Sequence, residues 1–317
     1  MFHIRIIKFL DYIFNKKLDS PSQREKELIK DLQNNIINSN YTLNTSALSE
    51  TSKLWAGYMC ELKKQFQISD PRSFLHWEII QKTMFIRYAP YIFNELRILK
   101  KSKFWNKKWK YAIKESYFGR PSPYIFYPRS SANLIHHTYH LAQFEEKMNV
   151  DLDKIDFILE FGGGYGSICR LFFNLNFKGK YLIYDLPYFV QLQEYYLKNL
   201  NLPVLSIDDI NNTKCGIICT SDLIILEKII RTYKGNQNLF IATWSLSEAP
   251  LDVRDPFVKL IRNFNNFLIG YQNIFGEVNN LEYFNNLSKL FKSISWLNLE
   301  NKNIHGSYYL FGIKKYK

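Results

Sequence analysis

An apolar run that ends in a cluster of glycines limits what this chain can fold into. The run Phe157 to Phe161 passes directly into Gly162, Gly163 and Gly164, and a further glycine follows at Gly166. Glycine tolerates tight turns and lets a backbone approach a ligand closely. A helix that starts after such a turn presents free N–H groups to polar ligand atoms. The junction therefore predicts a strand–turn–helix unit at the edge of a ligand site.

The rest of the second half continues the alternation that this unit begins. We expect further strands at 180–185, 204–207, 239–245 and 267–271, and helices at 165–175, 188–200, 253–265 and 281–291. The segments 295–299 and 308–314 are expected to close the sheet as an antiparallel pair. Strands that alternate with helices are typical of a doubly wound α/β fold. We therefore predict a Rossmann-like α/β domain with a seven-stranded sheet over residues 151–317.

Residues 1–150 show mostly helical periodicity and are predicted to form a basic helical region that recognises the substrate or covers the cofactor as a lid. Helices are expected at 20–37, 46–68, 71–100 and 130–147. The segment Met1 to Lys17 has one polar helical face, so it is interpreted as a terminal helix packed on its own domain, or as a helix on a membrane surface. No apolar run approaches the roughly 18 residues that a membrane span needs.

The positive charge lies mainly in the first half. Residues 1–150 hold 24 Lys and Arg against 13 Asp and Glu, whereas residues 151–317 hold 18 against 16. The segment from Arg97 to Lys114 alone has eight cations, no acid, and interleaved aromatic residues. Such a segment could hold an anionic membrane surface, a lipid-linked phosphate or a nucleic-acid backbone, or it could be a solvated helix face. An acidic partner should meet this half.

The four cysteines indicate a reducing compartment. Cys60, Cys169, Cys215 and Cys219 form no C-x-x-C pair and no repeated spacing, so neither a disulfide framework nor a metal site is expected. We predict a cytoplasmic protein, with the basic segment allowing a peripheral place at the inner membrane. The sequence says nothing of the oligomeric state.

The spacing of the acids around the glycines indicates the class of cofactor. Dinucleotide-binding turns follow G-x-G-x-x-G, but Ser167 stands where the third glycine of that pattern would be. The observed pattern instead places Glu160 two residues before Gly162, and an acid there suits a cationic amino group and would repel a pyrophosphate. Asp185 ends the next strand and can accept hydrogen bonds from ribose hydroxyls. The alternative is a tight β–α turn with two incidental acids.

These residues resemble the first motif of the class I S-adenosylmethionine (SAM)-dependent methyltransferases, over about residues 152–317. The resemblance implies that Glu160, Gly162, Gly164 and Gly166 bind SAM and that Asp185 holds its ribose. It also implies an adenine-side acid after the third strand, for which Asp208 and Asp209 are the candidates. The remaining candidates for cofactor contacts are Gly163, Leu186, Trp244 and Ser245.

A narrower resemblance connects three segments. Glu-Phe-Gly-Gly-Gly-Tyr-Gly at 160–166, Tyr-Asp-Leu-Pro at 184–187 and Thr-Trp-Ser-Leu-Ser-Glu at 243–248 resemble the bacterial sugar O-methyltransferases. Members of that family occur with genes for surface polysaccharides such as capsules, and they carry a helical region before the glycine turn. The resemblance implies methylation of a sugar hydroxyl in such a glycan, or in its nucleotide- or lipid-linked precursor.

Candidate groups for activating a hydroxyl lie in two places. A general base contributes about 10²–10⁴-fold, and histidine suits that role near neutral pH. His136, His137 and His140 cluster just before the second half, and we expect base or substrate contact there; the alternative is a partly buried helix with polar tips. Glu248, after the fourth strand, is a second candidate. The serines at 245 and 247 are explained equally well as caps of the helix beginning near Pro250.

Two other functions remain open at this stage. A nucleic-acid methyltransferase would suit the basic half, but the chain lacks an Asp/Asn-Pro-Pro-Tyr/Phe motif and has no cysteine that follows a proline. Nucleic acid is therefore the less favoured partner. A non-catalytic binding protein that keeps the fold is disfavoured because the glycine and acid pattern is intact.

Overall fold

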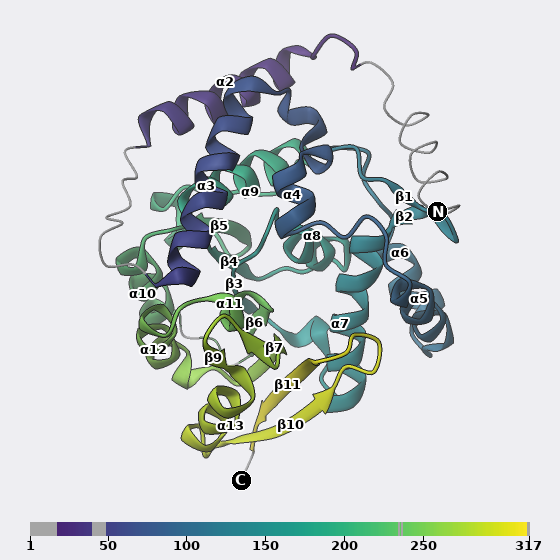
Figure 1. The fold of residues 1–317 in the computed structure, drawn as a ribbon, viewed down its shortest axis with the longest axis vertical. Helices are drawn as coiled ribbons and strands as arrows, with labels where there is room; N and C mark the ends of the chain where they lie inside the picture. Colours follow the sequence, from purple (N-terminus) through teal and green to yellow (C-terminus); the bar gives the residue numbers. More distant parts are fainter. Residues whose placement is uncertain (1–17, 40–48, 234, 236, 316–317) are drawn as a thin grey trace.

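The computed structural model describes residues 18–39, 49–233, 235 and 237–315 (Figure 1). The terminal helix expected over Met1 to Lys17 lies outside the described residues. In the described part of the chain, no helix is long and apolar enough to cross a membrane.

A seven-stranded, mostly parallel sheet forms the centre of the molecule (Figure 1). Its order is β10-β11-β7-β6-β3-β4-β5, and β11 runs antiparallel to both of its neighbours. The predicted Rossmann-like α/β fold and the antiparallel closing pair are confirmed. The strands are β3 (Phe157–Phe161), β4 (Lys180–Tyr184), β5 (Gly216–Thr220), β6 (Asn238–Thr243), β7 (Asn266–Gln272), β10 (Ile294–Glu300) and β11 (Ser307–Lys314).

One expected strand was wrong. The segment 204–207 makes only an isolated bridge, from Val204 to Ile217, and the third strand is β5 instead. All five residues of β5 are buried, as a continuous run without polar alternation. Parallel strands covered on both faces have this composition. The segment 204–207 has only two apolar residues before Ser206, so it cannot supply such a strand.

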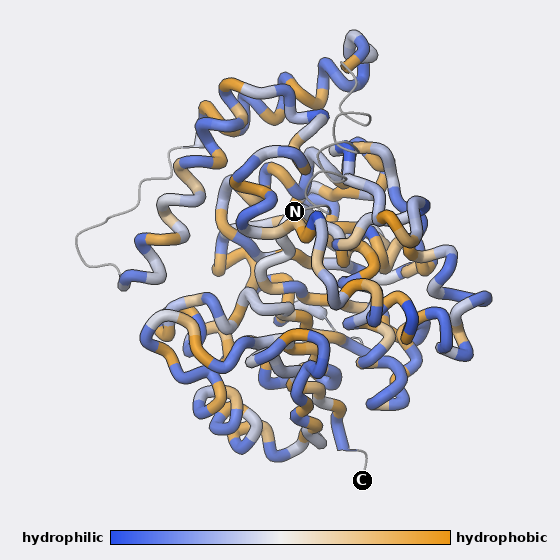
Figure 2. Tube along the Cα trace, turned by 45° about the vertical axis from the view of Figure 1, so that its right-hand side comes forward, coloured by the Kyte–Doolittle hydropathy of each residue, from blue (hydrophilic) through white to orange (hydrophobic). Residues whose placement is uncertain are grey.

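Helices cover both faces of the sheet. Side chains alternate along a strand, so Ile158 points into one core and Leu159 into the other. The first core contains α8 (Ser167–Asn174) and α9 (Pro187–Asn199) together with the N-terminal helices. The second core contains α10 (Leu223–Thr232), α12 (Leu251–Leu260) and α13 (Asn280–Leu290). In Figure 2 the hydrophobic stretches gather in the interior, while the outer helices alternate in hydropathy.

The first half is mostly helical, as predicted, and it shares a core with the sheet. The helices are α2 (Gln23–Asn38), α3 (Glu50–Ile68), α4 (Glu78–Thr83), α5 (Tyr91–Lys101), the short α6 (Lys110–Ala112) and α7 (Ala132–Met148). Leu32 and Leu62 belong to the same cluster of buried side chains as Ile158. The helix expected over 71–100 was wrong, because the chain breaks between α4 and α5. Pro90 has no N–H to continue a helix, and it biases the preceding residue away from helical geometry.

The order of the strands predicts where the ligand crevice lies. From β3 the chain moves to β4 and β5 on one side, and β6 then pairs with the other side of β3. Ligands of open α/β sheets bind outside the carboxyl ends of the strands where the order reverses. In this chain that point lies after Phe161 of β3 and Thr243 of β6.

Candidate functional site

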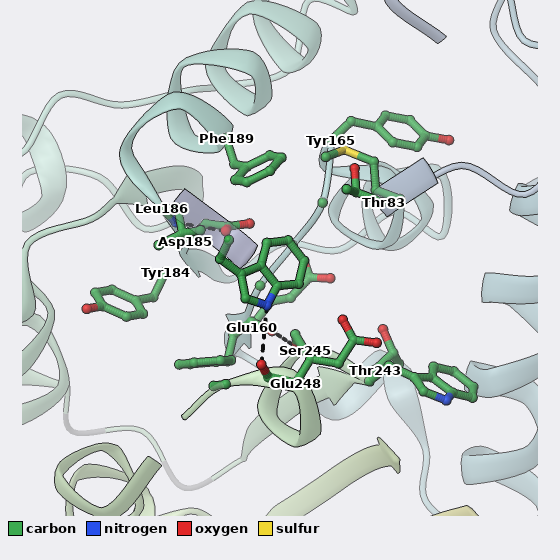
Figure 3. A pocket seen from close by; sticks show the side chains of 18 of the residues that line it. Thr83, Glu160, Tyr165, Tyr184, Asp185, Leu186, Phe189, Thr243, Ser245 and Glu248 are labelled. Atoms are coloured by element: carbon green, nitrogen blue, oxygen red, sulfur yellow. Dashed lines mark hydrogen bonds between the residues drawn. The ribbon is translucent and has the colours of Figure 1, made fainter. Parts of the chain in front are cut away.

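A cavity of about 1100 Å³ opens at the carboxyl ends of β3, β4 and β6. Small-molecule pockets usually measure about 300–1,000 Å³, so this cavity has room for a cofactor together with an acceptor. Residues of α3, α4 and α7 form the opposite wall, which means that both halves of the chain build the site. Figure 3 shows Glu160, Asp185, Ser245 and Glu248 around this space.

The glycine turn after β3 depends on its glycines. Gly162, Gly164 and Gly166 have φ angles of +70°, +59° and +91°, which side chains disfavour. A Cβ at Gly162 would lie 2.3 Å from the Cβ of Ser245, and one at Gly164 would lie 3.3 Å from the Cβ of Met84. The turn is therefore held between the end of β6 and the end of α4.

Glu160 is a buried acid beside this turn. Its side chain is 2% exposed, and Oε2 accepts a hydrogen bond of 2.8 Å from the Tyr181 hydroxyl. Burial raises the pKa of Glu160 to about 8, the Tyr181 hydrogen bond opposes the rise, and the charge of Asp185 adds to it. In the described part of the chain no Lys or Arg pairs with this carboxyl group. An uncompensated buried carboxyl group favours a cationic ligand group.

Asp185 lies at the end of the neighbouring strand and lines the same cavity. Its Oδ1 accepts the N–H of Leu186 at 2.8 Å, and its Oδ2 accepts Nε2 of Gln193 at 2.7 Å. Burial raises the pKa of Asp185 to about 7, while these hydrogen bonds and the N–H groups of Gly164 and Gly163 oppose the rise. Because β3 and β4 pair in parallel, acids that are 25 residues apart meet at one edge. Leu186 also lines the cavity.

The expected adenine-side acids are not in the cavity. Asp208 and Asp209 are exposed and lie in a short 3-10 turn (Asp208–Asn211) that precedes β5, so they do not follow the third strand. Asp222 follows β5 and lines the cavity, and its Oδ1 also caps α10 by accepting the N–H of Ile224 at 2.7 Å. The sequence carried this signal, an Asp two residues after an apolar run, but the wrong choice of strand hid it.

Trp244 directly follows β6 and lines the cavity. Trp244 has a φ of +65°, which is rare for a large side chain and costs about 1–3 kcal/mol. Its ring centroid lies 5.0 Å from that of His140 and 5.7 Å from that of His136. Ser245 next to it donates a hydrogen bond to the carbonyl of Phe161, so it fixes the glycine turn onto α11 (Ser245–Glu248). Both Trp244 and Ser245 line the cavity.

The capping interpretation of the two serines was wrong. Helix α12 starts after Pro250 without a side-chain cap, and Ser247 Oγ instead donates to the carbonyl of Trp244 at 2.6 Å. Glu248 lines the cavity, and burial raises the pKa of its carboxyl group to about 7. Its backbone carbonyl accepts Nε1 of Trp55 at 3.2 Å, which ties α3 across the cavity to α11.

The three histidines of α7 all line the cavity, but they differ in their partners. Nδ1 of His136 lies 2.8 Å from Oε2 of Glu95, a fully buried acid of α5. Nδ1 of His140 lies 2.6 Å from the hydroxyl of Tyr309. Burial lowers the pKa of His137 to about 3 and that of His140 well below its ordinary value, and the charge of His136 adds to both effects. No sequence pattern pointed to Glu95, because it lies 41 residues earlier on another helix.

Among the described residues, no group of three or more His, Cys, Asp or Glu side chains is placed to hold a metal ion. The site consists of a glycine turn, the buried Glu160, the half-buried Asp185 and a histidine cluster around one cavity.

No family model and no curated protein sequence matches this chain. Among solved structures, the mitomycin 7-O-methyltransferase MmcR is 12% identical with a TM-score of 0.33, covering 78% of this chain and 74% of that one. TrmK of M. capricolum in complex with S-adenosyl-homocysteine is 14% identical with a TM-score of 0.32, covering 55% and 68%. The glycopeptide N-methyltransferase MtfA complexed with SAM is 9% identical with a TM-score of 0.35, covering 55% and 87%. Similarity at this level carries no inference about activity, so the fold assignment rests on the strand order of the chain itself.

Proposed function

We propose that this protein is a SAM-dependent O-methyltransferase that acts on a sugar hydroxyl of a bacterial surface polysaccharide or of its nucleotide- or lipid-linked precursor. One observation carries the proposal. A single cavity joins the glycine turn, the buried Glu160 and the half-buried Asp185 to a histidine that is paired with a buried carboxyl group. This arrangement offers a place for a cationic cofactor and, in the same space, a group that can deprotonate an acceptor.

The residues at the sheet edge fit SAM. SAM carries an ammonium group and a sulfonium centre but no phosphate, and it supplies an electrophilic methyl group. Glu160 suits the ammonium group, because its buried carboxyl group has no cationic partner in the described part of the chain. Asp185 suits the ribose hydroxyls, and the backbone from Gly162 to Gly164 leaves room for a ligand to approach closely.

His136 is the best candidate for the general base. Glu95 accepts a hydrogen bond from Nδ1–H, so Nε2 of His136 is the atom that can take the proton of an acceptor hydroxyl. The buried carboxylate then stabilises the imidazolium that forms, as the carboxylate does in an acid–histidine pair of a hydrolase. His137 and His140 stay neutral because burial lowers the pKa of both, so they serve as polar wall groups.

The lining around His136 supports a sugar as the acceptor. The ring centroid of Tyr91 lies 5.3 Å from that of His136, and the ring centroid of Trp244 lies 5.7 Å from that of the same histidine. Aromatic walls with a few convergent polar groups are typical of sites that bind and orient small ligands. Glu248, held in the same cavity, can accept a hydrogen bond from a second hydroxyl of the sugar. Alignment of acceptor and donor in such a site can contribute roughly 7–11 kcal/mol.

Calorimetric titration with SAM, S-adenosylhomocysteine and NAD tests the cofactor class. We expect the first two to bind and NAD not to bind. Binding of NAD, or of none of the three, would overturn the proposal. Incubation with radiolabelled SAM and a panel of nucleotide sugars and polysaccharide fragments then tests the acceptor, with His136→Asn as the matched inactive variant. Methyl transfer to RNA but to no carbohydrate would replace the acceptor class by nucleic acid.

A further inference from the structure

The basic segment from Arg97 to Lys114 forms an outer face of the molecule together with the neighbouring hairpin. It runs from the second half of α5 through a π-helical turn (Trp105–Trp109) to the short α6, and α5 lies at the outside of the molecule beside α7 (Figure 1). Lys108 is not part of this face, because it pairs with Glu145. The exposed cations that carry the argument are Arg97, Lys100, Lys101, Lys103, Lys107 and Lys110.

Exposed apolar side chains stand beside these cations. Ile125 and Phe126 form the tip of the hairpin between β1 (Pro123–Tyr124) and β2 (Tyr127–Ser131), and they are 44% and 55% exposed. Phe93 of α5 is 51% exposed, and its ring centroid lies 5.2 Å from that of Phe126. Phe93 and Arg97 are four residues apart, so they share one face of α5. The exposed apolar side chains at the hairpin tip therefore adjoin Phe93, and Phe93 adjoins the cations of α5.

No acid on this stretch neutralises the cations. Between residues 84 and 131 the sequence has only two acids, Glu95 and Glu115. Glu95 is fully buried against His136, and Glu115 pairs with Arg170 inside the fold. Lys100 Nζ lies 5.3 Å from the ring centroid of Tyr127. This contact places the end of α5 beside the hairpin. Among the described residues, none of these exposed cations forms an ion pair with an acid, so the face presents positive charge beside a small apolar centre.

We propose that this face docks on an anionic lipid bilayer. Phe93, Ile125 and Phe126 enter the boundary of the headgroups and acyl chains, and the surrounding cations contact lipid phosphates. Peripheral membrane binding combines buried apolar area with attraction to anionic lipids, and this face offers both. A nucleic-acid backbone would use the cations and stack on the aromatic rings, but it gives an exposed aliphatic residue such as Ile125 nothing to bury against.

The proposed docking face, around Phe93, lies close to the part of the cavity that is lined by His136. Helix α5 begins with Tyr91, which lines the cavity beside His136, and two residues later Phe93 points to the outside. A bilayer bound at Phe93 would therefore hold a lipid-linked acceptor close to the cavity wall. This last consequence rests on the proposed function. Membrane binding itself can be measured without methyl transfer, so the two can fail separately.

Co-sedimentation of the full chain with vesicles tests the proposal. We expect binding to vesicles of phosphatidylglycerol and phosphatidylcholine, and little binding to phosphatidylcholine alone. The double variant Lys100→Glu/Lys101→Glu should lower the partition coefficient at least about 25-fold, since each cation near such a surface contributes about fivefold. Phe126→Ser should lower it about tenfold through lost apolar burial.

A matched control lies on α13, where Leu290 is 64% exposed beside the exposed Lys289. The variant Lys289→Glu/Leu290→Ser removes one cation and one apolar side chain from another surface and should bind vesicles as the unaltered protein does. The proposal is overturned if the unaltered chain ignores anionic vesicles, or if the Lys100/Lys101 and Phe126 variants keep full binding while retaining the native melting temperature. Salt-sensitive binding to single-stranded RNA, without binding to vesicles, would assign the face to nucleic acid instead.

Discussion

Replacing Glu160 by glutamine should stabilise the ligand-free protein at pH 8 and weaken its binding of SAM. Glutamine has the same shape and can still accept the hydrogen bond from Tyr181, but it cannot carry a charge. The change therefore isolates the charge of a buried residue, since Glu160 is only 2% exposed. The two effects have opposite signs, and both follow from the same burial.

The size of the stability effect follows from the pKa. Burial raises the pKa of Glu160 from an ordinary value of 4.5 to about 8. Above pH 4.5 the unfolded chain loses this proton while the folded chain keeps it, so the free energy of unfolding falls until the pH passes about 8. The full difference corresponds to at most about 4–5 kcal/mol. Because buried sites relax and admit water, we expect Glu160→Gln to be more stable by about 2–4 kcal/mol at pH 8 and nearly unchanged at pH 5.

Urea denaturation at pH 5 and pH 8 measures the first effect, and calorimetric titration with SAM at pH 8 measures the second. Loss of a charge-assisted hydrogen bond of about 1.5–3 kcal/mol should weaken SAM binding about 10- to 150-fold. In the unaltered protein, SAM affinity should rise from pH 6 to pH 9 as Glu160 ionises. A variant that is destabilised at pH 8, or that binds SAM as tightly as the unaltered protein, would refute this account of Glu160.

Five further substitutions test the cofactor residues, the glycine turn and the histidines, with Gly57→Ala and His137→Asn as the comparison variants. Asp185→Asn should weaken SAM binding about tenfold or more, measured by calorimetry, and an unchanged affinity would contradict the ribose assignment. Gly162→Ala should destabilise the fold by about 2–4 kcal/mol because its Cβ would lie 2.3 Å from Ser245, whereas Gly57→Ala in α3, with nothing within 4 Å, should stabilise it by about 0.5–1 kcal/mol in thermal unfolding. His136→Asn should lower kcat about 10²–10⁴-fold with little change in SAM affinity, and His137→Asn should lower it far less. Equal losses for the two histidines would contradict the assignment of the base.

Local patterns in the sequence were enough to predict the glycine turn and the two acids of the cofactor site. The glycine turn after β3 and the acids at 160 and 185 follow from backbone rules that act over a few residues. Their meeting follows from the parallel pairing of consecutive strands. The strand β5 was missed because the short apolar run at 204–205 comes directly after the second helix, where alternation predicts the third strand, whereas the longer run at 216–220 forms it. That error moved the expected third acid from the position of Asp222 to Asp208 and Asp209.

The partners across the cavity depend on contacts between distant parts of the chain. Helical periodicity predicts that the three histidines share one helix, but nothing in the local sequence distinguishes them. The packing of α5 on α7 gives His136 a buried carboxylate, from Glu95, 41 residues away, while β11 gives His140 a tyrosine. Trp55 likewise reaches the carbonyl of Glu248 across 193 residues. Short-range periodicity fixes which face of a helix is buried, whereas the identity of what it is buried against depends on how distant helices pack on the sheet.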